Sequence, residues 1–364
     1  MSGAESARHR GPSGMLLFMT IFLLLHIPLF IYPVFRLGDW LGLGDLLVWI
    51  TALPILLSQI ISRWLLRKVR QEWLKRLRQF ADLILGISPV VLINLLLAEI
   101  AVALGWIAAE SAAWTVLAVS FLIGGLGVLV ALYPLVKRVN LRSSKLAMPL
   151  RIVQITDVHI GSRSARFLEE LLARIVPLEP DLLCITGDFI DAWAVPEKEL
   201  VALRNLDFPI YFSTGNHERY EDLEAILARL ENLGVVVLCN RAVMHRDDVQ
   251  VIGIDDQDDV RQVERELANI PLAERSFKLL MYHRPVGLEA AASAGIDLML
   301  SGHTHNGQIF PFNLLVKRVF KRIVGMYSLS DTVLYVSQGT GTWGPVMRIG
   351  TRSEITLFEL EKLE

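Results

Sequence analysis

Four apolar stretches in the first 140 residues constrain the fold of this chain more than any other feature. They cover residues 15–35, 46–62, 83–109 and 112–136, and Glu99 is the one Asp, Glu, Lys or Arg within them. A helix needs about 20 apolar residues to cross the hydrocarbon core of a bilayer, where it satisfies its own backbone hydrogen bonds. The sequence therefore predicts an N-terminal α-helical transmembrane bundle of about four spans.

Two of these stretches leave an alternative. Residues 46–62 form a short stretch that contains Pro54, which also suits a tilted or re-entrant segment. Residues 15–35 follow a basic start, as in a signal peptide, but they exceed the roughly 7–15 apolar residues of a signal. Since no small-residue cleavage site follows them either, we expect this first segment to be retained as a span.

The charge of the chain changes sign along its length. Residues 1–150 carry a net charge of +7 and the remainder carries −9, although the whole chain has only −2. Hydrophobic residues make up 53% of the chain, which excludes a disordered protein or one that coats nucleic acid. We therefore predict a membrane domain over 1–148 and a water-compatible domain over 149–364, without a nucleic-acid partner.

Lysine and arginine gather between the second and third spans and after the fourth. These residues are Arg63, Arg67, Lys68, Arg70, Lys75, Arg76, Arg78, Lys137, Arg138, Arg142 and Lys145. Basic loops stay on the cytoplasmic side of a membrane. The rule predicts a multi-pass protein of the cell membrane whose N-terminus and C-terminal domain both face the cytoplasm.

Two segments combine basic side chains with large apolar ones. In 63–78 this mixture predicts an amphipathic helix on the anionic leaflet, with a solvated loop as the alternative. In 310–327, which holds four basic residues and no acid, it predicts a lobe that dips into the membrane, with an ordinary core-plus-surface helix as the alternative. Both segments fall on the side that we assign to the cytoplasm.

Single polar residues inside apolar segments also have two interpretations. Glu99 and His26 lie at membrane depth, where an ionisable group is either functional or hydrogen-bonded between helices. Cys184 and Cys239 lie in or after apolar runs, so we expect buried free thiols rather than a disulfide.

From Leu150 onward the pattern changes to short β-branched runs separated by helical stretches. Expected strands are 151–156, 181–186, 210–214, 278–282 and 296–300, and expected helices are 168–175 and 222–233. Strands that alternate with helices are typical of an α/β domain.

Each expected strand is followed by residue types that bind metals. These residues are Asp157, His159, Asp188, Asn216, His217, His283, His303 and His305. Open α/β sheets form their sites at the carboxyl ends of strands, so we expect these side chains to converge. Nitrogen and oxygen ligands without a thiolate favour Mn, Fe or Zn, and the seven other than His217 suit two divalent ions that share one carboxylate, an arrangement that acts on phosphorus.

The sequence resembles the calcineurin-like metallophosphoesterase superfamily over about residues 150–360. The blocks that carry the resemblance are Asp157-x-His159, Gly187-Asp188, Gly215-Asn216-His217-Glu218, His283 and Gly302-His303-Thr304-His305. The resemblance implies a four-layer αββα sandwich with two mixed sheets. Gly307-Gln308 and residues 338–345 are similar to a membrane-associated subgroup of that family.

The resemblance also implies a role for each site residue. One ion would be held by Asp157, His159, Asp188 and His305, and the other by Asp188 as a bridge with Asn216, His283 and His303. His217 would stabilise the transition state or protonate the leaving group, which suits an imidazole that titrates near neutral pH. Glu218 either orients His217 or is an acid at a helix N-terminus.

These features predict a membrane-anchored, metal-dependent phosphoester hydrolase at the cytoplasmic surface. Its expected partners are the lipid bilayer and a phospholipid or nucleotide-linked lipid that carries a phosphoester or pyrophosphate. The alternative is a membrane sensor whose phosphodiesterase domain cleaves a soluble nucleotide or another soluble phosphodiester. A truncation at Lys145 that keeps activity on soluble diesters but loses it on lipid esters would favour the first.

Overall fold

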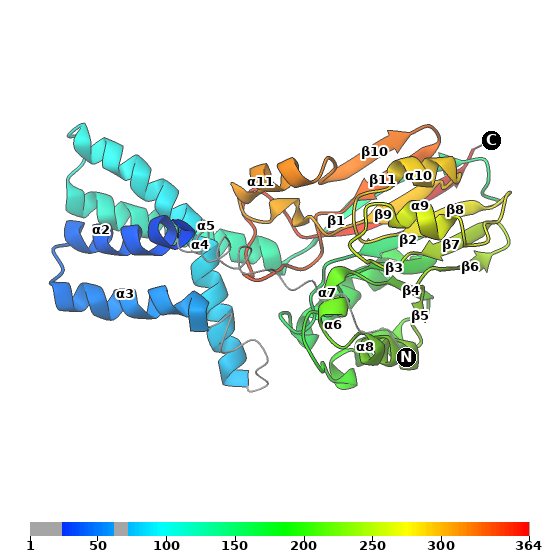
Figure 1. Ribbon diagram of the computed structural model, residues 1–364, viewed down its shortest axis with the longest axis horizontal. Coiled ribbons are helices and arrows are strands. Elements are labelled where there is room, and N and C mark those ends of the chain that lie inside the picture. Colours follow the sequence, from blue (N-terminus) through cyan, green and yellow to red (C-terminus); the bar gives the residue numbers. More distant parts are fainter. Residues whose placement is uncertain (1–23, 62–71, 364) are drawn as a thin grey trace. The chain divides into compact units, whose positions relative to one another are not determined.

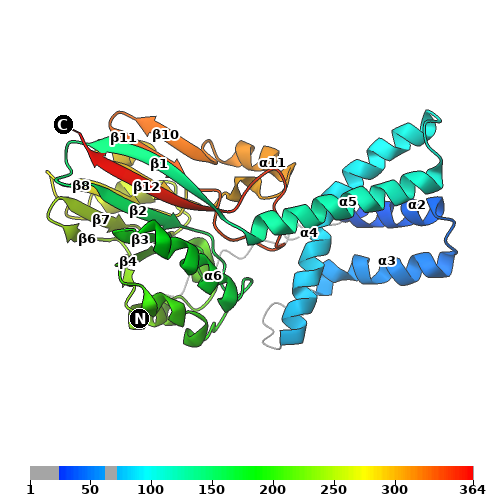
Figure 2. The ribbon, with the colours of Figure 1, turned by 180° about the vertical axis from the view of Figure 1, so that it is seen from behind.

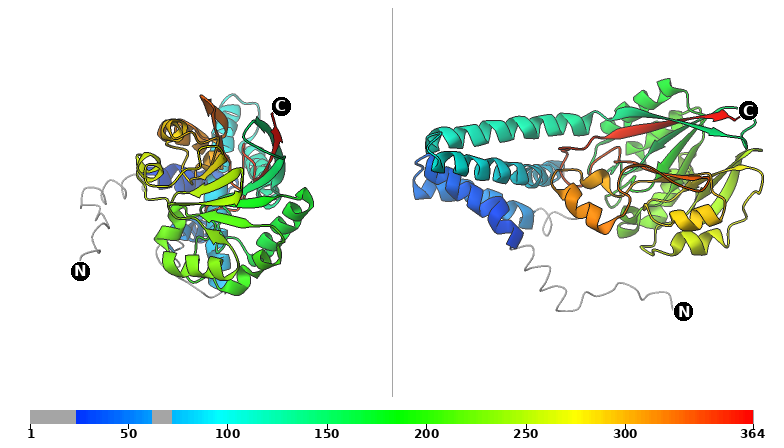
Figure 3. Two further views of the ribbon diagram at one scale, coloured as in Figure 1. Left: turned by 90° about the vertical axis from the view of Figure 1, so that its right-hand side faces the viewer. Right: turned by 90° about the horizontal axis from the view of Figure 1, so that it is seen from above.

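The computed structural model describes residues 24–61 and 72–363. The chain forms two compact units that divide between Gly125 and Leu126. Helix α5 (Ala109–Leu132) starts in the first unit and ends in the second, where it leads into strand β1 (Leu135–Ser143) after two residues (Figure 3).

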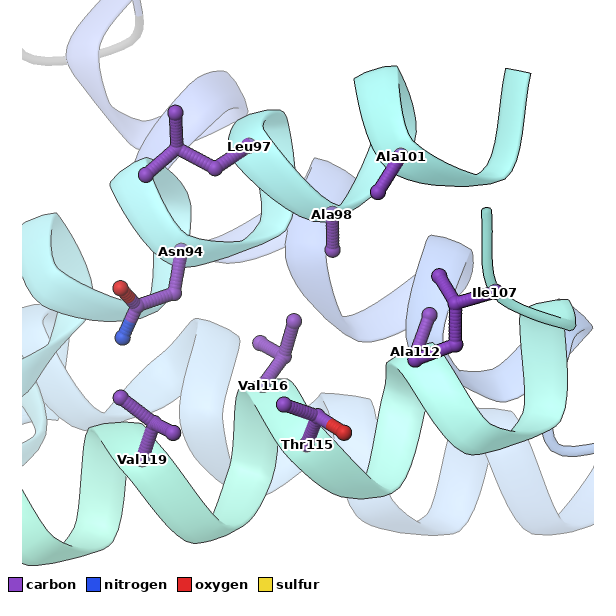
Figure 4. A pocket seen from close by; sticks show the side chains of 9 residues that line it. All are labelled: Asn94, Leu97, Ala98, Ala101, Ile107, Ala112, Thr115, Val116 and Val119. Atoms are coloured by element: carbon purple, nitrogen blue, oxygen red, sulfur yellow. The ribbon is translucent and has the colours of Figure 1, made fainter. Parts of the chain in front are cut away.

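The described part of the first unit consists of helices joined by polar contacts. They are η1 (Ile27–Ile31), α2 (Tyr32–Trp40), α3 (Asp45–Ile60), α4 (Glu72–Ala103) and the first part of α5. Arg36 Nε lies 2.5 Å from Glu99 Oε1, and Asn94 donates to Ser120 Oγ at 2.9 Å. Glu99 thus has a partner on another helix, in agreement with the interpretation that it is hydrogen-bonded between helices. Asn94 and Val116 help to line a pocket of about 250 Å³ between α4 and α5 (Figure 4).

Two helices among the described residues are long and apolar enough to cross a membrane, Trp73–Ala103 and Ala109–Leu132. The apolar helix Asp45–Gln59, on the second expected span, is shorter. The first expected span, 15–35, lies partly outside the described residues, and so does the expected surface helix 63–78, up to residue 71. The described residues therefore contain two candidate spans where the sequence predicts four.

Both candidate spans end before the expected residues 109 and 136. Helix α4 ends at Ala103, and Gly105 takes the left-handed conformation (φ +72°) that closes many helices. Helix α5 ends at Leu132 because Pro134 follows and disfavours helical backbone in the residue before it.

Two mixed six-stranded sheets form the second unit. Their orders are β1-β12-β2-β3-β4-β5 and β10-β11-β9-β8-β7-β6. The strands after β1 are β2 (Leu150–Ile155), β3 (Leu182–Thr186), β4 (Ile210–Ser213), β5 (Val236–Val237), β6 (Arg241–Arg246), β7 (Val249–Gly253), β8 (Phe277–Met281), β9 (Leu298–Ser301), β10 (Gly325–Leu329), β11 (Thr332–Val336) and β12 (Glu354–Lys362). Strands β2 to β5 pair in parallel, as do β7, β8, β9 and β11, so each set directs its carboxyl ends to one edge.

Helices cover the outer faces of both sheets. Helices α6 (Ala165–Ile175) and α8 (Leu223–Asn232) pack on the first sheet, and α9 (Gln262–Leu267) and α10 (Leu288–Ser293) pack on the second. The domain also contains α7 (Asn216–Tyr220), α11 (Phe312–Val319) and the short 3₁₀ turns η3 (Val176–Leu178), η4 (Glu197–Glu199), η5 (Val201–Asn205) and η6 (His305–Gly307). One apolar core joins the first sheet to α6 and α8, a second lies between the sheets, and a third joins the second sheet to α9 and α10. This is the expected α/β sandwich of four layers (Figure 1).

Strand β1 is an element that the sequence analysis does not predict. Its residues fall at the end of the fourth expected span and in the basic cluster after it. In the structure β1 pairs in parallel with the C-terminal strand β12 (Figure 2), and its basic residues contact that part of the domain. Arg138 Nη1 lies 3.0 Å from Glu359 Oε1, and Lys137 lies over the ring of Tyr335.

Candidate metal centre

Short loops at the carboxyl ends of parallel strands carry the predicted ligands. Asp157 and His159 follow β2, Asp188 follows β3, Asn216 follows β4, His283 follows β8, and His303 and His305 follow β9. The strands are buried along their length, so the first polar side chains come where each strand leaves the sheet. The structure brings these loops together, as the sequence predicts.

Asp157, His159 and His305 form one group whose ligand atoms all lie within 4.8 Å of one another. The Nε2 atoms of His159 and His305 are 3.3 Å apart, and His305 Nε2 lies 3.2 Å from Asp157 Oδ1. Two imidazole nitrogens and a carboxylate that face one point are suited to a shared cation.

Asp188, His283 and His303 form a second group of the same kind. His283 Nε2 lies 3.1 Å from both Asp188 Oδ2 and His303 Nδ1. The loop of Asn216 reaches this group, because the backbone N–H of His217, the next residue, donates to Asp188 Oδ1 at 2.8 Å. The buried Oδ1 of Asn216 has no hydrogen-bond partner within the described part of the chain. A buried amide oxygen without a donor is costly unless another group uses its lone pairs, and a cation would do so.

His217 belongs to a third group, with His159 and with Asp191, a residue that the sequence analysis does not select. The rings of His217 and His159 are 4.8 Å apart at their centroids, and Asp191 Oδ2 lies 3.3 Å from His159 Nδ1. Tyr220 and Trp343 also contact His217, with ring centroids at 5.8 and 6.5 Å. The position of Asp191, three residues after Asp188, was the one available signal.

Glu218 stabilises the loops of the centre instead of orienting His217. Its fully buried carboxylate accepts hydrogen bonds from the backbone N–H groups of Asp188, Phe189, Ile190 and Gly215, at 2.6–3.1 Å. The bond to Gly215 is that of an acid in the first turn of α7, so the helix-terminus interpretation of Glu218 fits the structure.

The backbone of the centre is held in an unusual conformation. Five of the seven predicted ligands have positive φ angles, between +47° and +71°: Asp157, His159, Asp188, His303 and His305. Such backbone costs energy in residues other than glycine and occurs mainly at functional sites. Two glycines let these loops approach one another closely. A Cβ on Gly302 would lie 2.3 Å from Asp157 Oδ2, and a Cβ on Gly341 would lie 2.3 Å from the Val158 carbonyl oxygen.

Residues 150–307 match the family described as calcineurin-like phosphoesterase. They form a calcineurin-like metallophosphoesterase domain. Over 241 residues, 63% of this chain, it is 33% identical to an uncharacterized metallophosphoesterase of Campylobacter jejuni. Over 239 residues, 62% of this chain, it is 34% identical to an uncharacterized metallophosphoesterase of Helicobacter pylori. Over 236 residues, 58% of this chain, it is 35% identical to a transmembrane protein with metallophosphoesterase domain of Bos taurus. The chain spans less than two thirds of these relatives, 63%, 64% and 53% of their lengths.

The electrostatics of the metallophosphoesterase domain suit a cation. Burial would raise the pKa of Asp157, but His305 beside it holds this pKa below its ordinary range, and His283 does the same for the pKa of Asp188. Burial, together with His283, lowers the pKa of His303 to about 3. Against the effect of burial, Asp188 raises the pKa of His283 to about 10. The carboxylate that raises the pKa of His283 would equally attract a cation, which binds a neutral imidazole in place of its proton.

A second acidic cluster borders the centre of the metallophosphoesterase domain. Residues 255–259, Asp-Asp-Gln-Asp-Asp, have the composition of a surface loop or strand-end turn. In the structure they do follow strand β7, but Asp255 and Asp256 are buried. Asp255 pairs with Arg219, and Asp256 accepts from Arg284 Nε at 2.8 Å. The two arginines follow His217 and His283 closely in the chain, so these pairs fix the loops that carry those histidines.

Proposed function

We propose that this chain is a metal-dependent hydrolase of phosphoester or pyrophosphate bonds. The observation that carries the proposal is the pair of ligand groups at one edge of the sheets, each with a buried carboxylate, Asp157 or Asp188. Carboxylates as deeply buried as these need a compensating positive charge. Without a cation, only the crowded histidines beside them could supply it. The family of residues 150–307 supports the same activity.

The residues fit two divalent ions, and Mn, Fe or Zn suits their nitrogen and oxygen donors. One ion would be held by Asp157, His159 and His305 and the other by Asn216, His283 and His303, with Asp188 between them. The unpartnered Oδ1 of Asn216 is the observation that supports its place in this set. Two such ions would lower the pKa of a water molecule and offset the charge of the phosphoryl oxygens.

His217 is the proposed catalytic residue. Its ring contacts the buried ring of His159 and the exposed side chains of Tyr220 and Trp343. A substrate that enters past these aromatic side chains would meet His217 before the carboxylates. From there the imidazole would stabilise the transition state or protonate the leaving oxygen.

The membrane part of the proposal has four spans and a cytoplasmic domain. It is supported by the two candidate spans, by the basic clusters of the sequence and by the transmembrane relative from Bos taurus. Helix α5 leads into β1 after two residues, so the domain has no long linker to leave the bilayer surface. This tether favours a lipid-linked substrate, a phospholipid or a nucleotide-linked lipid.

The test uses the full chain, purified in detergent and reconstituted in vesicles. Metal content is measured together with hydrolysis of a phospholipid, a nucleotide-linked lipid, a soluble nucleotide and a small chromogenic phosphodiester. We expect metal-dependent hydrolysis with the lipid esters preferred. Faster hydrolysis of the soluble nucleotide would favour the sensor, and no hydrolysis of any ester by metal-loaded protein would contradict the proposed activity.

The truncation at Lys145 is not a suitable test. It would remove β1 and expose the edge of β12, to which all nine residues of β1 are paired. A cut between Leu132 and Leu135 keeps this strand and is the appropriate form of the experiment.

A further inference from the structure

Helix α11 is amphipathic, but its apolar side chains face solvent instead of a core. Phe312, Leu315 and Val319 are spaced as one helical stripe and are 37%, 55% and 76% exposed. Leu314, on another side of the helix, is 52% exposed, and no residue of α11 is buried. An exposed apolar stripe of this kind marks an interaction surface.

The segment that carries this stripe has only basic charges of its own. Residues 310–327 contain Lys317, Arg318, Lys321 and Arg322 and no acid. Arg322 pairs with Glu289 at 2.7 Å, whereas Lys317 and Arg318 are exposed and form no ion pair within the described part of the chain. An apolar stripe bordered by unpaired basic residues is complementary to an anionic lipid surface.

Helix α11 is held firmly against the metal centre at its base. Phe320, which ends the helix, packs edge-on against His303 with ring centroids 5.3 Å apart. Thr304 donates from Oγ1 to the Ile323 carbonyl at 2.6 Å. The exposed stripe is therefore part of the rim of the site and not a free tail.

The same rim receives the end of helix α5. The Phe310 N–H donates to the Ile349 carbonyl at 2.9 Å. Ile349 in turn lies against Gly127 of α5, where an added Cβ would be 3.0 Å from its side chain. Ile349 thus connects the segment that leads into α11 with helix α5, which is proposed to enter the bilayer.

We propose that α11 docks on the anionic leaflet from which α5 emerges, with Phe312, Leu315 and Val319 among the lipid headgroups and Lys317 and Arg318 at the phosphates. This contact presents the rim beside His303 to the membrane surface. The inference rests on the proposed membrane anchoring but not on phosphoesterase activity.

The test places a fluorophore on the full chain in nanodiscs. Leu315→Cys is labelled in a Cys239→Ser background, since Cys184 is buried and its pKa is raised by that burial. The probes are nanodiscs of phosphatidylcholine alone or mixed with phosphatidylglycerol, with and without brominated acyl chains. We expect the bromine to quench the label several-fold more in the anionic nanodiscs than in the neutral ones. The same label at Val201→Cys, also an exposed apolar position, should not be quenched.

A matched pair of charge variants completes the test. Lys317→Gln with Arg318→Gln should reduce the quenching at Leu315→Cys in anionic nanodiscs. Lys198→Gln with Arg275→Gln removes the same charge from exposed positions elsewhere in the domain and should not. Quenching no greater than at Val201→Cys, or equal loss in both double variants, would overturn the proposal. Protection of the label that is independent of lipid composition would point to a protein partner and overturn it too. Failure of the chain to enter nanodiscs would instead contradict the anchoring.

Discussion

Arg348 donates from Nη1 to the backbone carbonyl of His305 at 3.2 Å, although the two residues are 43 positions apart. The arginine is almost completely buried, and its Nη2 also donates to the carbonyls of Gln338 and Gly341 at 2.6 and 2.8 Å. Its backbone N–H donates to the Gly127 carbonyl on α5 at 2.9 Å. Through its backbone N–H and its side chain, this one residue therefore connects a candidate membrane span with the loop of a predicted metal ligand.

The first prediction concerns this arginine. Arg348→Met leaves the carbonyls of His305, Gln338 and Gly341 without its donors, and each buried group without a partner costs about 1–3 kcal/mol. We expect the free energy of unfolding to fall by at least about 2 kcal/mol and metal affinity to weaken, because the loop of His305 loses its support. Thermal unfolding and metal titration of the detergent-purified chain measure the two effects.

Two further variants separate packing from charge at this position. Arg348→Lys keeps the charge but not the planar fork of donors, so it should recover only part of the loss. Arg352→Met changes an exposed arginine four residues later and should leave both measurements unchanged. Wild-type stability in Arg348→Met would show that the buried hydrogen bonds contribute little.

The second prediction concerns the ligands. Asn216→Ala and His303→Ala should each remove at least one ion and lower turnover strongly, with the fold retained. His217→Ala should keep both ions and still lose about 10²–10⁴ in rate, as expected for a general acid. Metal analysis of the purified variants, beside their rates, distinguishes these outcomes. Loss of metal in the His217 variant would assign it to the ligands instead.

The third prediction concerns metal removal. A ligand that binds only the folded state at about 1,000 times its Kd adds about 4 kcal/mol to stability. We therefore expect a chelator to lower the Tm of the full chain, and added Mn or Zn to restore it. A chain that carries both Asn216→Ala and His303→Ala is the control: it loses ligands of only one of the two proposed ions, so its response to either treatment should be smaller than that of the wild type.

The convergence of the candidate ligands could be predicted from sequence because these residues follow their strands closely. The apolar run 182–186 and the Gly187-Asp188 pair after it lie in one short segment, so the position of Asp188 depends on local structure. The same is true of His283, which follows β8 by one residue. Parallel pairing then brings the loops together without further information.

The supporting residues could not be predicted, because their roles depend on long-range contacts. A basic residue such as Arg348 is rarely buried, and nothing in its neighbourhood indicates the carbonyls that surround it. Strand β1 looks like the end of a span with a basic cluster, and only its partner β12, more than 200 residues later, makes it a strand. Asp255 and Asp256 resemble a solvated acidic turn until Arg219 and Arg284 are brought beside them.

The fourth prediction concerns pH and the pair Arg246 and Asp248. Arg246 Nε lies 2.5 Å from Asp248 Oδ1, and Asp248 also accepts from the Ala147 N–H. Burial would raise the pKa of Asp248, but these hydrogen bonds lower it. Because the folded pKa lies below the unfolded value of about 4, the pair stabilises the fold above that pH and loses its effect as pH falls through the folded pKa.

Asp248→Asn should thus lower stability by about 1–3 kcal/mol at pH 7, and its difference from the wild type should shrink below about pH 4. Thermal unfolding between pH 3 and pH 7, at about half-unit steps, measures this difference. Asp247→Asn makes the same charge change at an exposed neighbour and should match the wild type at pH 7. A difference that stays constant with pH would contradict an ionic contribution.

The last prediction concerns Trp343 at the rim of the centre. Its ring is 54% exposed and contacts His217, while its backbone N–H donates to Gln308 Oε1 at 2.9 Å and its carbonyl accepts from Gln308 Nε2 at 3.0 Å. Both bonds use the backbone, so Trp343→Ala removes the ring and leaves the loop attached. A bulky lipid-linked ester that passes this ring should show a KM raised several-fold in Trp343→Ala. A small chromogenic phosphodiester should show little change in kcat, because the ligands and His217 are intact. Met244→Ala, which trims an exposed apolar side chain on β6, should alter neither value. An equal loss on both esters would place Trp343 in the support of His217 rather than in contact with the substrate.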